Sequence, residues 1–172
     1  NDAIAYGVRN NDAEATSEIT YDAQGRVIKV KAPAPTPGAA RAESTVAYGT
    51  NSTELHVTGA SEPHGFSKKV TYDSLFRTTS ETDLANLTTT TEWHPDKDLV
   101  LSTTDPTGLK STTIYNEDDL PTDTYGAAPA SWFGVDNKPL ATKINDVPHV
   151  QTGYDEDIRG LGVSYYDNKK LL

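Results

Sequence analysis

An aromatic residue followed by a short polar turn recurs along this chain at a nearly constant spacing. The stretches "TYDAQGRVI" (20–28) and "TYDSLFRTT" (71–79) are the clearest copies, and "IYNEDDLPT" (114–122) is a looser one. The aromatic residues that open the turns are separated by 27, 24, 21 and 22 residues; they are Tyr21, Tyr48, Tyr72, Trp93 and Tyr115. This spacing fits one β-hairpin with its connection, and such a unit cannot bury its apolar face alone. The repeat therefore predicts antiparallel hairpins that pair into a larger open or spiralling sheet.

The residues between the turns favour strands over helices. In "GRVIKVKA" (25–32) apolar and lysine side chains alternate, and "LTTTTEW" (87–93) is rich in β-branched threonine, which suits strands. The stretch "DPTGL" (105–109) carries Pro and Gly at turn positions. Helical periodicity is nearly absent, and the apolar share of 35% indicates a thin core. The sequence therefore predicts an all-β fold.

Charge and composition limit the classes of partner. The net charge is −10, which disfavours nucleic acid and anionic membrane surfaces. The chain has no cysteine, so it has neither disulfides nor thiolate metal sites. No apolar run is long enough to cross a membrane. The first residues lack an initiating methionine and a leader-like pattern, so we expect a piece of something longer.

Two stretches rich in proline interrupt the pattern. The first, "APAPTPGAA" (32–40), cannot be a central strand and is expected to be a surface excursion. The second, "YGAAPASWFGVDNKP" (125–139), is followed by a loss of the regular period. We therefore expect three parts: hairpin repeats over 1–129, a Pro/Gly-rich loop and linker over 130–159, and a terminal strand over 160–172.

The turn sequences resemble the YD motif of RHS/YD-repeat proteins, in particular the secreted proteins of this family from actinobacteria. "YDAQGRV" (21–27) carries the whole motif, whereas "YDSLFRT" (72–78) has Phe76 where glycine is usual. The stretches "WHPDKDLV" and "YNEDDLP" are weaker copies. The positions that match as structural residues of the repeat are Tyr21, Asp22, Gly25, Arg26, Tyr72, Asp73, Arg77, Trp93 and Tyr115.

This resemblance implies a sheet of hairpins that spirals into a shell, which encloses a toxic domain in polymorphic toxins. About five hairpins are too few to close a shell, so the chain would form a section of its wall. The resemblance also implies a bacterial protein that is secreted or displayed on the cell surface. The expected partners are the rest of the parent polypeptide or a second copy bound through edge strands.

The last residues leave two alternatives open. The stretch "GLGVSYYDNKKL" (160–171) resembles the first strand of a protective-antigen-type carbohydrate-binding β-sandwich. It could equally be a terminal strand that pairs with the sheet of repeats. Its alternating apolar residues make it a strong candidate for adding to another sheet.

Candidate chemistry in the sequence is sparse. "DPTGL" (105–109) resembles the Asp-Pro-containing segment near the self-cleavage site of RHS toxins, but it is also a good β-turn, and no second Asp-Pro follows. His56, His64, His94 and His149 lack zinc-ligand spacing, and the acidic stretches "HPDKD" (94–98) and "NEDD" (116–119) do not match a calcium loop. We expect no catalytic residue, no metal site, no cofactor and no enzymatic activity.

Three aromatic residues give a second hypothesis. Tyr125, Trp132 and Phe133 lie in or beside the second Pro/Gly-rich stretch, where exposed rings could stack on sugars. They could instead plug one end of the sheet. The sequence thus favours a structural wall or scaffold segment, with a module that binds cell-surface carbohydrate as the alternative and a self-processing aspartic protease as a weaker one.

Overall fold

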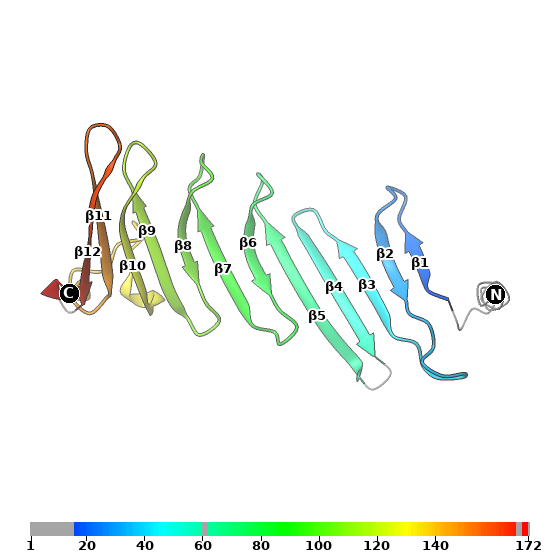
Figure 1. Ribbon diagram of the computed structural model, residues 1–172. Helices are drawn as coiled ribbons and strands as arrows, with labels where there is room; N and C mark the ends of the chain where they lie inside the picture. The colour runs from blue at the N-terminus through cyan, green and yellow to red at the C-terminus, as the bar shows by residue number, and fades with distance from the viewer. Residues whose placement is uncertain (1–15, 60–61, 168–169, 172) are drawn as a thin grey trace, which may run out of the picture. The chain divides into compact units, whose positions relative to one another are not determined.

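The computed structural model describes residues 16–59, 62–167 and 170–171. The chain divides into two compact units, residues 1–87 and 88–172. Both are built from antiparallel strands that follow one another along the sheet in the order of the sequence (Figure 1).

The described residues of unit 1 form six strands, which pair in the order of the sequence. Their bounds are β1 Glu18–Tyr21, β2 Val27–Lys31, β3 Glu43–Tyr48, β4 Ser52–Gly59, β5 Glu62–Tyr72 and β6 Thr78–Thr82. The Pro-rich stretch at 32–40 lies between β2 and β3, outside the strands, as predicted. No described residue of unit 1 is buried, so its stability rests on the strand ladder and on side-chain pairs along it.

Unit 2 contains the other strands, which also pair in sequence order from β7 to β13. Their bounds are β7 Thr88–Trp93, β8 Val100–Thr104, β9 Leu109–Tyr115, β10 Pro121–Pro129, β11 His149–Tyr154, β12 Gly160–Asp167 and β13 Lys170–Leu171. A single 3-10 turn, η2, spans Ala130–Trp132. The prediction of an all-β fold of repeated antiparallel hairpins in an open sheet is confirmed.

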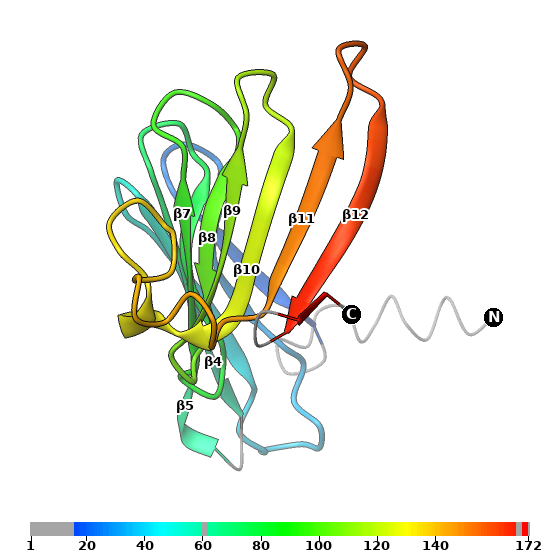
Figure 2. The ribbon, with the colours of Figure 1, turned by 90° about the vertical axis from the view of Figure 1, so that its left-hand side faces the viewer.

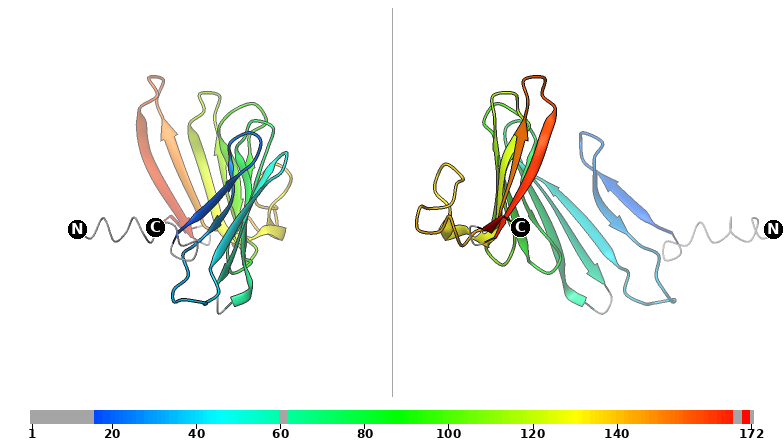
Figure 3. Two further views of the ribbon diagram at one scale, coloured as in Figure 1. Left: turned by 90° about the vertical axis from the view of Figure 1, so that its right-hand side faces the viewer. Right: turned by 60° about the vertical axis from the view of Figure 1, so that its left-hand side comes forward.

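The segment between β10 and β11 folds over one face of unit 2. It lies beside the sheet rather than within it (Figure 2 and Figure 3, right). Here Tyr125, Ala128 and Val147 are buried, and Ile114, Trp132 and Phe133 pack against them. This cover gives unit 2 the small apolar core that unit 1 lacks.

One expectation about the end of the chain differs from the structure, and the structure favours one of the two alternatives left open for 160–171, a strand that pairs with the sheet. Strand β11 lies within 130–159, which the sequence suggested was a loop and linker, and it pairs with both β10 and β12. Residues 160–167 form β12, which continues the sheet of unit 2 as the partner of β11. The long cover segment at 130–148 broke the regular spacing, so the strand after it was not recognised.

Candidate functional site

The recurring turn is a five-residue loop that begins with an aspartate. In its first copy the amide of Asp22 donates to the carbonyl oxygen of Arg26, at 2.9 Å, and the amide of Gly25 donates to that of Asp22, at 3.0 Å. The Asp22 Oδ1 atom accepts from the amides of Gln24 and Arg26, both at 2.9 Å. The side chain thus satisfies backbone donors inside the turn. The fourth residue has a positive φ, as expected for a hairpin loop that ends in a G1 bulge.

The same backbone pattern, named here the aspartate loop, recurs seven times within the described residues. Its copies span 22–26, 73–77, 83–87, 105–109, 116–120, 134–138 and 155–159. The first residue is Asp in five copies, Asn116 in one and Gly134 in one, where Asp136 supplies the carboxylate oxygen instead. The fourth residue has φ between 61° and 86° in every copy; these residues are Gly25, Phe76, Asn86, Gly108, Asp119, Asn137 and Ile158.

In three copies an arginine in the fifth position pairs with the aspartate of the first. The Nε atoms of Arg26, Arg77 and Arg159 lie 2.7, 2.7 and 2.8 Å from the carboxylate oxygens of their loop partners. Hydrogen bonds from the backbone and side chain of Arg159 lower the pKa of Asp155. The Tyr-Asp-x-x-x-Arg pattern therefore has a structural role, because the aspartate accepts from the Nε atom of the arginine within the same loop.

The aromatic residues of the repeat occupy equivalent places. Each one is the last residue of the first strand of a hairpin: Tyr21 ends β1, Tyr48 ends β3, Tyr72 ends β5, Trp93 ends β7 and Tyr115 ends β9. Their rings are not deeply buried, and that of Tyr21 is 56% exposed.

Three tyrosine hydroxyls tie one hairpin to the one before it. Tyr48 donates to the carbonyl oxygen of Val27 at 3.1 Å, and Tyr115 donates to that of Val100 at 3.0 Å. Tyr154 donates to the carbonyl oxygen of Pro121 at 3.1 Å. In each case the acceptor is at or beside the start of the preceding strand. Each tyrosine thus links neighbouring hairpins, and after Tyr115 and Tyr154 the next residue, Asn116 or Asp155, also shapes the loop.

Tyr154 and Asp155 begin a further copy that the sequence analysis missed. "YDEDIR" (154–159) ends β11 and forms an aspartate loop like the others. It has the Tyr-Asp pair and the arginine of the motif, with Ile158 where glycine is usual. A search for Tyr-Asp-x-x-x-Arg without a fixed period would have found it.

On the covered face of unit 2, one row of side chains crosses the sheet. The register aligns Glu92 with Ser102, Ser102 with Thr112, Thr112 with Tyr125, Tyr125 with His149 and His149 with Tyr166. Directly opposed residues in an antiparallel sheet share a face. Ser102 donates to Glu92 Oε2 at 2.9 Å, and the buried hydroxyl of Thr112 has no hydrogen-bond partner.

His149 is the most constrained titratable side chain of this row. Its ring stacks on Tyr125, with centroids 4.4 Å apart, and on Tyr166, with centroids 5.2 Å apart. Its Nε2 atom lies 2.7 Å from Asp123 Oδ1. The histidine therefore joins β10, β11 and β12 at the point where β10 and β11 pair over only three positions.

The three residues suggested for carbohydrate binding do not form an exposed aromatic platform. Tyr125 is buried, and burial raises the pKa of its hydroxyl. Trp132 and Phe133 are partly buried against the same core, and Lys143 Nζ lies 4.3 Å from the Trp132 ring centroid. This arrangement favours the alternative in which the rings plug one end of the sheet.

Asp105, the suggested protease residue, occupies the first position of an aspartate loop. Its Oδ1 atom accepts hydrogen bonds from the hydroxyl and amide of Thr107 and the amide of Leu109, and the Thr107 hydroxyl makes the largest contribution to lowering its pKa. Such a carboxylate is held ionised by its turn. Within the described residues, no group of three or more His, Cys, Asp or Glu is placed to hold a metal ion.

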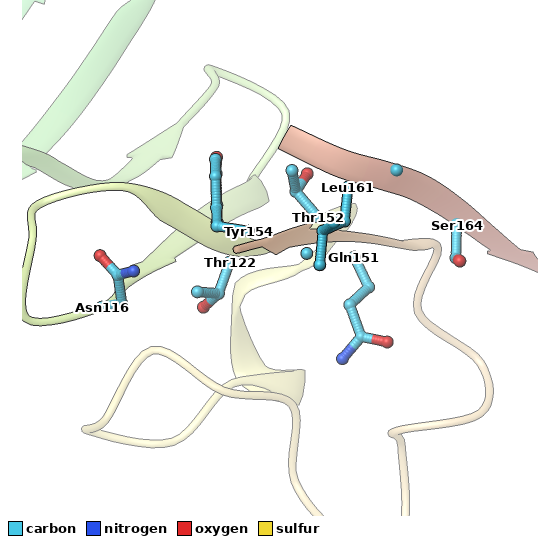
Figure 4. A pocket seen from close by; sticks show the side chains of 9 residues that line it. Asn116, Thr122, Gln151, Thr152, Tyr154, Leu161 and Ser164 are labelled. Carbon is cyan, nitrogen blue, oxygen red and sulfur yellow. The ribbon is translucent and has the colours of Figure 1, made fainter. Parts of the chain in front are cut away.

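A hollow of about 560 Å³ in unit 2 lies where β10 and β11 diverge (Figure 4). Among its lining residues, Asn116 shapes its own aspartate loop, Thr122 donates to Ile114 and Tyr154 donates to Pro121. Tyr154 points to one side of the strands, whereas Gln151 and Ser164 point to the other. The polar side chains that line the hollow therefore do not converge as free groups on one binding site.

Comparison with models of protein families and with curated proteins gives no match for this chain. In the part of the chain that the structure describes, no helix has the length and apolar character needed to span a membrane. The geometry on its own defines a class of protein: a sheet of hairpins with one repeated loop.

Proposed function

We propose that this chain is a non-enzymatic wall or scaffold segment of a larger secreted bacterial protein of the YD-repeat type. The observation that carries the proposal is the aspartate loop, which recurs with the same hydrogen bonds in both units. Repeat architectures stack similar units so that each contacts its neighbours, and they serve as extended frameworks.

The chemistry of the loops supports this proposal over the two alternatives. The charges of Asp22, Asp73 and Asp155 are paired within their own loops. Asp105, on which the protease hypothesis depends, is engaged by its own turn. Tyr125, on which the carbohydrate hypothesis depends, is buried. Each of these side chains is accounted for by a structural role.

The outer edge of strand β12 is suited to pairing with a further strand. On its outer side, the described residues pair only at Tyr166 and Asp167. Leu161, Val163 and Tyr165 alternate along the strand, and all three are exposed. An exposed apolar edge strand is a template for another strand. In the proposed parent protein the next hairpin, or the edge of a second copy, would cover it.

Light scattering at micromolar concentration tests this role. We expect the wild-type chain to self-associate and the Val163→Lys variant to be monomeric, because a charged edge strand resists pairing. The matched control is Ile158→Lys, which adds the same charge at an exposed loop residue outside the edge. Association that is equal in the wild type and in Val163→Lys would contradict the role of this edge.

A further inference from the structure

The requirements of folding do not explain why a phenylalanine stands at position 76. It is the fourth residue of the aspartate loop at 73–77, with φ of 62°, and its side chain is 80% exposed. A bulky residue in the left-handed region is a genuine outlier, and such outliers gather at functional sites. The equivalent loop at 22–26 has Gly25, which adopts this conformation without strain. Phe76 therefore adds backbone strain and exposed apolar surface without filling a core.

The ring of Phe76 lines a pocket of about 280 Å³ within unit 1. The pocket lies among the first aspartate loop, the turn between β3 and β4, and the loop at 73–77; its side chains include Arg26, Tyr48, Thr50, Thr53, Tyr72 and Phe76. Three aromatic rings and three serine or threonine side chains, Ser52 included, thus line it, and no carboxylate side chain does. Its volume is near the lower end of ligand pockets, about 300 Å³, which suits one small ring with a short substituent.

Arg26 supplies a positive charge to this pocket. Its Nε atom donates to Asp22 Oδ2 at 2.7 Å, and its guanidinium carbon lies 4.3 Å from the centroid of the Tyr48 ring. Within the described residues, its two terminal nitrogens make no hydrogen bond. A guanidinium held in place by stacking and by one hydrogen bond is prepared to bind a carboxylate through the donors that remain.

We infer that this pocket binds a small aromatic carboxylate, either as a free acid or as the C-terminal aromatic residue of a peptide. The ring of the ligand packs among Tyr48, Tyr72 and Phe76, where aromatic pairs favour offset or edge-to-face contacts. The carboxylate meets the terminal nitrogens of Arg26. The chain as a whole carries a net charge of −10, so this local arginine is what attracts an anion. The inference is independent of the scaffold role.

Titration calorimetry with 3-phenylpropionate, its neutral amide and acetate tests the chemistry. We expect saturable binding of 3-phenylpropionate, at least ten-fold weaker binding of the amide and no saturable binding of acetate. Equal binding of acid and amide, or no binding of the acid, would overturn the inference. N-acetyl-glycyl-phenylalanine separates the two sources: tighter binding than that of the free acid assigns the site to a peptide terminus, and weaker binding assigns it to a free acid.

Variants separate binding from folding. Phe76→Asn places a residue that already occupies the same loop position at Asn86 and Asn137, so the fold is retained. We expect it to raise the thermal midpoint and to weaken binding of 3-phenylpropionate at least ten-fold. The matched control is Ile158→Asn, the other bulky apolar residue at this position, which should raise the midpoint without changing binding. Arg26→Gln should bring the acid to the affinity of the amide, because it removes the positive charge. Wild-type affinity in Phe76→Asn would overturn the inference.

Discussion

The hydroxyl of Tyr115 donates a hydrogen bond to the carbonyl oxygen of Val100, and the two oxygens lie 3.0 Å apart. Tyr115 ends the first strand of one hairpin, and Val100 begins the second strand of the hairpin before it. The bond therefore joins successive repeats at the end at which the 116–120 aspartate loop closes its hairpin. Tyr48 and Tyr154 make the same bond between hairpins, and in the Tyr115-Asn116 and Tyr154-Asp155 pairs the second residue also shapes the loop.

Tyr115→Phe should reduce the free energy of unfolding by about 0.5–1.5 kcal/mol, because it removes one hydrogen bond and keeps the ring. Chemical denaturation measures the change. The control is Tyr165→Phe, since Tyr165 is exposed and its hydroxyl has no hydrogen bond within the described residues. Equal effects of the two substitutions would show that the inter-hairpin bond does not stabilise the fold.

His149→Ala should be more damaging, with a loss of about 1–3 kcal/mol, because it leaves the partly buried Asp123 carboxylate without its partner and removes the stacking on Tyr125. His56→Ala serves as a comparison, since among the described residues His56 has one side-chain hydrogen bond, to Ser67, and no stacked ring. Thermal unfolding followed by circular dichroism distinguishes them. A loss at His149 no larger than that at His56 would contradict the role given to the stack.

Gly126→Ala should destabilise the chain far more than Gly25→Ala. Both glycines have a positive φ, but a Cβ atom at position 126 would lie 2.6 Å from the carbonyl oxygen of Lys110, whereas one at position 25 would meet nothing within 4 Å. Gly25→Ala therefore costs only backbone strain, about 1–2 kcal/mol of the free energy of unfolding. Comparable midpoints in urea for the two variants would contradict the close approach of β9 and β10.

The aspartate loops predict a dependence of stability on acid. Arg159 lowers the pKa of Asp155 in the folded chain, so the stability from this group is present above the ordinary pKa of aspartate. This stability is lost as the pH falls from the ordinary pKa of aspartate through the lowered pKa of Asp155. Asp155→Asn should keep the turn, as Asn116 does in its own loop, and should lose less stability between pH 7 and pH 3. Identical pH profiles of the urea midpoint would contradict this linkage.

The repeat could be predicted from the sequence because its aromatic residues and turns are local signals. Tyr21, Tyr72 and Tyr115 each precede an Asp or Asn that shapes the following loop, and this relation needs no distant partner. The hairpin at Tyr154 was missed because the cover segment lengthened the interval before it. Its Tyr-Asp pair was nevertheless present as a signal.

The burial of Tyr125 and the stacking of His149 could not be predicted in the same way. Both depend on the cover segment returning over the sheet and on the register of β10 with β11. The left-handed conformation of Phe76 was also hidden, because a bulky residue gives no local indication of a positive φ. These features follow from tertiary context rather than from residue pattern.

Deletion of one whole hairpin, compared with deletion of one strand, tests the repeat architecture most directly. Removal of 43–59 takes out β3 and β4 together and leaves β2 and β5 antiparallel, so they can pair. Removal of 52–59 takes out β4 alone and leaves β3 and β5 parallel, which needs a crossover of a dozen or more residues. We predict that amide hydrogen exchange shows protected β2 and β5 after the first deletion and loss of protection in β3 and β5 after the second. Loss of protection in both variants would contradict a sheet built from interchangeable hairpins.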